Sequence, residues 1–116
     1  MHIFYDIRNL SLRRKKALLI DALALSDEWW IDVLDCSKSL ARQRIDMEFG
    51  EMLKKLKSDC HFVVIDREFY PTDKFKHFEI GFSTMSGTPA YYLWIRVADR
   101  HMPNLLKKYK LAKWTK

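Results

Sequence analysis

The sequence has few of the residues that build cross-links, linkers and turns. Two cysteines, three glycines and three prolines occur among its 116 residues. So little glycine and proline leaves hardly any room for flexible linkers or disorder. The N-terminus lacks the apolar segment of a secretory signal. Together with a count of only two cysteines, this argues against a disulfide framework and indicates a reducing compartment. We therefore expect a single domain over residues 1–116, located in the cytoplasm.

Long apolar runs and ligand-like cysteine spacing are missing as well. No apolar stretch has the length of a membrane span, so we expect no membrane partner. Cys36 and Cys60 lie far apart and His61 adjoins Cys60, which does not match the paired ligand spacing of a zinc site. The chain also has no glycine-rich phosphate loop. We expect no metal site.

What the chain does have is apolar and positively charged. Hydrophobic residues make up 48% of it, including four Trp, five Tyr and seven Phe, and its formal net charge is +6. The basic side chains gather in three runs: Arg13–Lys16, Lys54–Lys57 and Lys107–Lys110. Such an excess favours anionic partners, either nucleic acid or nucleotide. The same runs fit the solvated outer faces of amphipathic helices, and both interpretations stay open.

Apolar runs alternate with segments of helical periodicity along the whole chain. The apolar runs predict four strands, at His2–Ile7, Trp29–Asp35, His61–Asp66 and Ala90–Val97. The helical periodicity predicts four helices: Leu12–Leu25, a second opened by a Ser37 or Ser39 cap, Lys74–Gly87, and a last one around Met102–Tyr109, after which "LAKWTK" can add a short edge strand. This alternation predicts a flavodoxin-like three-layer α/β/α fold, whose parallel sheet has four to five strands in the order 2-1-3-4-5.

The stretch "KFKHFEIGFSTMSG", Lys74–Gly87, admits two interpretations. Its aromatic residues recur at spacings of three and four, which places them on one face of a helix together with Glu79. A capping residue before the segment and Gly87 after it favour the helix. Its aromatic richness favours a strand instead, which would form a hairpin with "YYLWIRV" and give an α+β fold.

In a doubly wound sheet, ligands bind beyond the carboxyl ends of the strands, where the strand order reverses. The residues that we expect around such a crevice are Tyr5, Asp6, Arg8, Asp35, Ser37 and Asp66. A carboxylate among phenylalanine rings, as expected for Glu79, loses hydration, and such acids are enriched at catalytic sites. The commoner alternatives are that Glu79 pairs with a lysine at the surface and that the aspartates cap helices or lie in loops.

The same region resembles a known sequence pattern. "FEIGFSTMSGTPAYYLWI" resembles E-[IL]-G-x-[AS]-x-x-x-G-x-P followed by an apolar strand, the pattern of the nucleoside 2-deoxyribosyltransferase-like superfamily. The matching residues are Glu79, Ile80, Gly81, Ser83, Gly87 and Pro89. The usual lysine before the proline is Thr88 in this chain. The preceding "CHFVVIDREFYPTDKFKHFE" is similar to TIR-like domains, including the small ones of bacterial anti-phage defence, with Phe75 as the aromatic residue four positions before the acid.

This resemblance implies cleavage or transfer at the N-glycosidic bond of NAD⁺ or a nucleotide, in bacterial signalling or defence. It implies that Glu79 is the catalytic carboxylate, that Tyr5, Asp6 and Arg8 lie on the substrate loop, and that Phe75 is a candidate for stacking the base. NAD⁺ or the nucleotide would be a substrate rather than a cofactor. Assembly into a homo-oligomer or with a partner protein is also implied.

Two other functions stay open at this point. The first is a catalytically silent TIR-like or flavodoxin-like interaction module. The second is a small basic nucleic-acid-binding protein that uses the Arg13–Lys16 and Lys107–Lys110 runs together with exposed aromatic residues.

Overall fold

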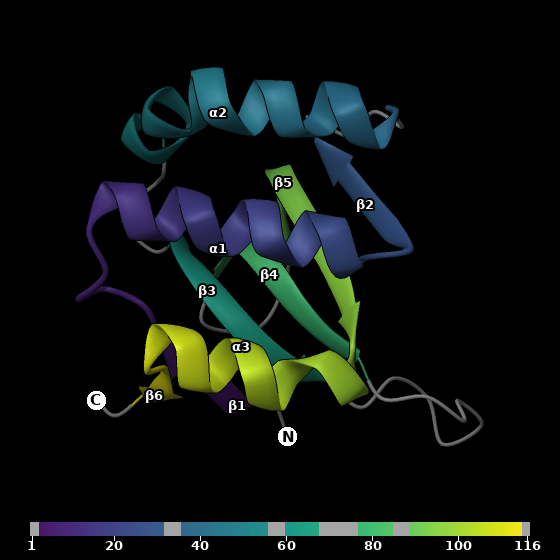
Figure 1. Ribbon diagram of the computed structural model, residues 1–116. Helices are drawn as coiled ribbons and strands as arrows, with labels where there is room; N and C mark the ends of the chain where they lie inside the picture. Colours follow the sequence, from purple (N-terminus) through teal and green to yellow (C-terminus); the bar gives the residue numbers. More distant parts are fainter. Residues whose placement is uncertain (1–2, 32–35, 56–59, 68–76, 85–88, 115–116) are drawn as a thin grey trace.

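The computed structural model describes residues 3–31, 36–55, 60–67, 77–84 and 89–114. They form a six-stranded sheet with three α-helices packed on one of its faces (Figure 1). The strands are β1 Ile3–Asp6, β2 Glu28–Ile31, β3 Cys60–Arg67, β4 His77–Thr84, β5 Pro89–Ala98 and β6 Ala112–Lys113. The helices are α1 Leu12–Leu25, α2 Lys38–Lys54 and α3 Met102–Tyr109, the last preceded by a 3₁₀ turn at Asp99–His101.

The sheet is antiparallel, so the prediction of a flavodoxin-like parallel sheet in the order 2-1-3-4-5 is wrong. The observed strand order is β2-β5-β4-β3-β1-β6, and every pair of neighbours is antiparallel. Parallel neighbours need a crossover of a dozen or more residues, usually a helix, between them. The segment predicted as that crossover is itself β4. Strands β3, β4 and β5 therefore pair in chain order as an antiparallel meander.

The predicted helix over Lys74–Gly87 is likewise wrong, because His77–Thr84 is a strand. Phe78 and Phe82 are four residues apart, a spacing that puts two side chains on one face of a helix and also on one face of a strand. Ile80 lies between them on that same strand face, and all three side chains are buried. The alternative hairpin is the confirmed interpretation, since Ile80 of β4 is paired with Ile95 of β5. Phe75 lies outside the described residues.

Serine caps begin the two long helices. The Ser11 hydroxyl accepts a hydrogen bond from the Arg14 backbone N–H at 3.2 Å, and α1 spans the predicted Leu12–Leu25. The Ser37 hydroxyl accepts from the Leu40 N–H at 3.1 Å and begins α2 in the same way. Side-chain caps of this kind satisfy backbone donors that a helix N-terminus leaves without an intrahelical acceptor.

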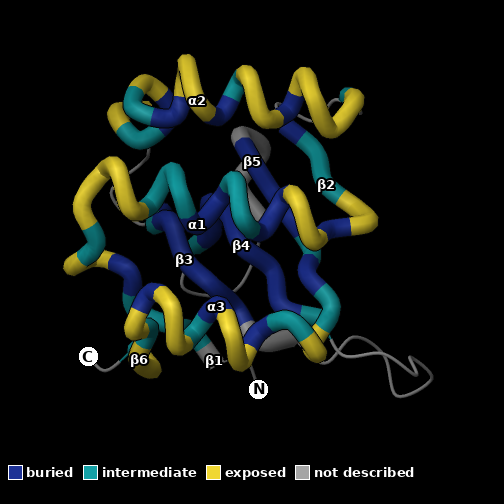
Figure 2. Tube along the Cα trace, viewed as in Figure 1, coloured by how far each residue is buried: buried dark blue, intermediate teal, exposed yellow. Residues whose placement is uncertain are grey.

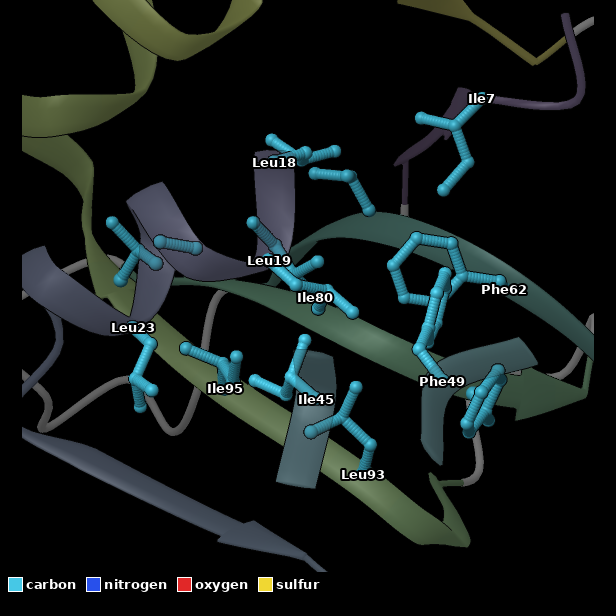
Figure 3. Packing of buried hydrophobic residues seen from close by; sticks show 14 of the residues in the cluster. Ile7, Leu18, Leu19, Leu23, Ile45, Phe49, Phe62, Ile80, Leu93 and Ile95 are labelled. Atoms are coloured by element: carbon cyan, nitrogen blue, oxygen red, sulfur yellow. The ribbon is translucent and has the colours of Figure 1, made fainter. Parts of the chain in front are cut away.

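The main hydrophobic core lies between the helices and one face of the sheet (Figures 2 and 3). At its centre three rings from α2, β3 and β4 meet: Phe49 lies 5.1 Å from Phe62 and 6.1 Å from Phe82, measured between centroids. Leu19 of α1 is fully buried in the same core. None of the helices among the described residues is long and apolar enough to cross a membrane.

The opposite face of the sheet carries a second apolar cluster, to which the three helices contribute none of the described residues. Val63, Ile65 and Trp94 are fully buried there, with Phe4, Trp30 and Trp114 packed against them. Gly81 lets the Trp94 indole cross β4, because a Cβ at Gly81 would come within 2.3 Å of both the Trp94 ring and the Leu93 carbonyl oxygen. A strand position with such close backbone approach requires glycine.

Candidate functional site

The predicted catalytic acid, Glu79, lies in the middle of β4 and not on a helix. Its position in the strand alternates with Phe78 and Ile80, so it belongs to the face opposite the helices, where it is 1% exposed. Arg96 is its partner across β4 and β5, and the Arg96 Nε lies 3.9 Å from the Glu79 Oε1. A buried carboxylate requires such a compensating charge.

Arg96 connects three strands through its guanidinium. Its Nη1 donates to the Glu28 Oε2 at 2.7 Å on β2, and its Nη2 lies 3.4 Å from the His77 Nδ1 on β4. With Glu79 this forms a row of alternating charge, Glu28–Arg96–Glu79, running across the sheet. Glu79 is dehydrated as predicted, but the helix and the crevice of parallel strands that were to hold it are absent from the described residues. Its role in N-glycosidic chemistry stays a prediction.

The other predicted site residues do not form one rim. Tyr5 packs against the helix-side core, with its ring 5.8 Å from that of Phe78. Ser37 caps α2, which begins on the far side of the molecule from β1 (Figure 1). Asp66 is the penultimate residue of β3, opposite Ile3 of β1. Asp35 and Phe75 lie outside the described residues.

Asp6 and Arg8 are the two predicted site residues that the structure brings together. The Arg8 guanidinium donates to both carboxylate oxygens of Asp6, from Nε at 3.0 Å and from Nη2 at 2.9 Å. The Arg8 backbone N–H adds a third hydrogen bond at 2.9 Å. The guanidinium hydrogen bond holds the pKa of Asp6 below its ordinary value, and the same bond raises the pKa of Arg8. The pair is therefore fully ionised at neutral pH.

The same arginine lies on an aromatic ring that was not among the predicted site residues. The Arg8 Cζ is 3.8 Å from the centroid of Trp114, close enough for a cation–π contact. Trp114 is held in turn, because its backbone N–H donates to the Phe4 carbonyl at 2.7 Å and its ring lies 5.6 Å from His61. We call the three residues Asp6, Arg8 and Trp114 the arginine stack.

Two basic runs that are distant in the sequence meet beside this stack. The Arg14 Nη2 donates to the Lys108 carbonyl at 3.1 Å, a contact between residues 94 positions apart. The Arg14 Cζ also lies 5.1 Å from the Tyr109 ring centroid. Lys110 then turns the chain in the left-handed conformation, with φ of 54°, and leads into β6. The start of α1, the end of α3 and β6 consequently share the left side of Figure 1.

We call this surface the basic edge. Its members are the exposed basic residues of these elements and of the turn after β1: Arg8, Arg13, Arg14, Lys107, Lys108, Lys110 and Lys113. The acids in contact with it are engaged: Asp6 with Arg8, and Asp21 with the Lys108 Nζ at 2.7 Å and with the Tyr109 hydroxyl. Burial works against the charge on Asp21, but these two hydrogen bonds outweigh it, so the pKa of Asp21 is lowered. Burial and the adjacent carboxylate raise the pKa of Tyr109.

Sequence reasoning identified the basic runs but not their convergence. Arg14 meets Lys108 only because α1 and α3 pack side by side on the sheet, and a local pattern does not encode that contact. The sequence does not mark Trp114 as a site residue, because a single tryptophan near a lysine-rich segment has no distinctive spacing. Among the described residues, no group of three or more His, Cys, Asp or Glu side chains is arranged to hold a metal ion.

Comparison with models of protein families, with proteins of known function and with solved structures finds no match to this chain.

Proposed function

We propose that the protein binds nucleic acid through the basic edge, by contacts to the phosphate backbone. The observation that carries the proposal is the convergence of the Arg13–Lys16 and Lys107–Lys110 runs, joined by the hydrogen bond from Arg14 to the Lys108 carbonyl. Lysine and arginine side chains gathered on one surface neutralise successive phosphates and release their counterions, which drives binding with little dependence on sequence.

The position of Arg13 in the first turn of α1 supports this function. A helix N-terminus carries a partial positive charge, so cations in its first turn are unfavourable there. The first turn of α1 nevertheless contains Arg13 and Arg14 and no acidic residue. Lys107 and Lys108, at the end of α3, are favourably placed for their own helix. Arg14 already contacts the Lys108 carbonyl and the Tyr109 ring, so it is the placement of Arg13 that supports contact with an anionic ligand.

The test is fluorescence anisotropy with short labelled oligonucleotides, titrated at several salt concentrations. We expect affinity to fall steeply between about 50 and 200 mM salt, as it does when several phosphates are contacted. The double variant Arg13→Gln/Lys107→Gln should bind more weakly at each salt concentration. It should also have a shallower salt dependence, by about 1.5 in the slope of log K against log salt, since two phosphate contacts are lost.

A matched control is the double variant Lys38→Gln/Arg42→Gln, which removes the same residue types from the exposed start of α2. In Figure 1 that helix end lies on the side opposite the basic edge. The control should bind nearly as the wild type does. Equal losses in the two variants would show that only net charge matters, and no binding at low salt would contradict the proposal altogether.

A further inference from the structure

We infer that the arginine stack is a binding place for one unpaired nucleobase, so that the nucleic acid bound at the basic edge is single-stranded. This inference rests on the proposed function, because it names the form of nucleic acid that the basic edge takes. In a duplex both faces of a base are covered by its neighbours, whereas a single strand can turn a base outward. Single-strand readers stack such bases on aromatic rings or on arginine planes.

The geometry of Arg8 fits this role because its plane is fixed before any ligand arrives. Two parallel hydrogen bonds to Asp6 set the orientation of the guanidinium within its plane, and Trp114 supports one face at 3.8 Å. A planar group that is already immobilised loses little conformational entropy when a ligand stacks on it. A lysine in the same place would supply the charge but no plane.

Arg8 also keeps surface for a ligand. Its side chain is 54% exposed although it is bound on one edge by Asp6 and on one face by Trp114. The face turned away from Trp114 is the side on which a base would lie. The hydrogen bonds to Asp6 use Nε and Nη2, which leaves Nη1 to donate to a base edge or a phosphate.

The arginine stack adjoins the phosphate-binding cations along the chain. Lys113 directly precedes Trp114 at the end of β6, and β6 is paired with the end of β1 that carries Asp6. Lys110 lies on the same short connection between α3 and β6. A single-stranded nucleic acid whose phosphates contact Lys110 and Lys113 would therefore have a base within reach of Arg8.

Three probes of equal charge separate base stacking from phosphate binding: oligo-dT, a strand of the same length that is abasic throughout, and a short duplex matched in phosphate number. The wild type should bind oligo-dT about tenfold more tightly than the abasic strand, in line with the contribution of one stacked base. The variant Arg8→Lys keeps the positive charge but loses the plane. It should bind the abasic strand as the wild type does and lose most of the preference for oligo-dT.

The variant Asp6→Asn makes the sharper distinction. Removing a negative charge from the basic edge should tighten binding of every probe if only electrostatics matter. If Arg8 acts as a stacking surface, loss of its fixed orientation should weaken binding of oligo-dT while binding of the abasic strand and the duplex is unchanged or tighter. Circular dichroism and a thermal melt establish that each variant is folded.

The outcomes distinguish the two proposals. Equal affinity of the wild type for all three probes overturns the stacking inference and leaves phosphate binding at the basic edge intact. Uniform tightening in Asp6→Asn overturns it as well. No binding of any probe at low salt overturns the proposed function and the inference together.

Discussion

Two arginine–carboxylate pairs in this protein have similar chemistry and opposite surroundings. Arg96 and Glu79 meet inside the sheet, with side chains 20% and 2% exposed, whereas those of Arg8 and Asp6 are 54% and 20% exposed. A buried pair is strongly destabilised when one partner is lost, because the remaining charge has no water. An exposed pair contributes little to stability. The comparison indicates that the first pair serves the fold and that the second is available for a ligand.

The largest expected effect separates the two pairs by stability. Arg96→Met leaves the Glu79 carboxylate buried beside an apolar side chain, and we expect it to lower the free energy of unfolding by about 3 kcal/mol. Arg8→Met is the matched control and should lower it by less than about 1 kcal/mol. Urea denaturation followed by circular dichroism measures both. Similar losses of unfolding free energy in the two variants would contradict the division into a structural pair and an available pair.

A second, smaller effect tests which member of the buried pair matters. Glu79→Gln keeps the shape of the side chain, and Arg96 retains its bond to Glu28, so we expect a loss of about 1 kcal/mol. In the double variant Glu79→Gln/Arg96→Met much of the cost of Arg96→Met alone should disappear, because no charge remains at position 79. Additive losses would mean that the two side chains are not energetically coupled.

The single variant Glu79→Gln also tests the predicted N-glycosidase activity. Wild type and Glu79→Gln are incubated with NAD⁺ and with deoxynucleotides, and released base is measured by chromatography. Release by the wild type that Glu79→Gln abolishes would support a catalytic carboxylate at this position. Release that survives the substitution would contradict it.

The smallest expected effect is a loss of stability at low pH. The folded-state pKa values of Asp6 and Asp21 are both lowered, so each contributes stability above its unfolded pKa, near 3.8, and loses it as the pH falls through the folded value. The urea midpoint of the wild type should therefore decrease below about pH 4. Asp6→Asn and Asp21→Asn should each flatten this decrease, because each removes a carboxylate whose folded-state pKa is lowered. A decrease that is equally steep in both variants and in the wild type would contradict the stabilising role of these two carboxylates.

Local signals in the sequence predict most of the elements. Capping and periodicity predict α1 and α2, and Ser37 is confirmed as the cap of α2. Apolar runs predict β1, β3 and β5 to within two residues at either end. The failure at β4 has a specific cause, since Phe78 and Phe82 are separated by an even number that also approximates one helical turn. The parallel strand direction was predicted from this wrong helix. A helix between β3 and β5 would have allowed those two strands to be parallel.

In the candidate site, too, local contacts are predictable from the sequence and long-range contacts are not. Asp6 and Arg8 are two positions apart, so their contact is local, although Asp6 ends β1 and does not lie on the loop that the resemblance implied. The partners of Glu79 and Arg14 are set by strand register and by helix packing, over long separations in the chain. Such contacts depend on topology, which one sequence does not specify. Assembly with a second copy or with a partner protein stays a prediction.

The brevity of β6 has a consequence for how these molecules behave in a crowded solution. It is the outermost strand on its side of the sheet, consists of Ala112 and Lys113, and both residues are exposed. A long, flat margin would offer its backbone amides and carbonyls as a template for strands of other chains. Among the described residues, β6 is two residues long and carries a lysine, and both features disfavour pairing with a strand of another chain.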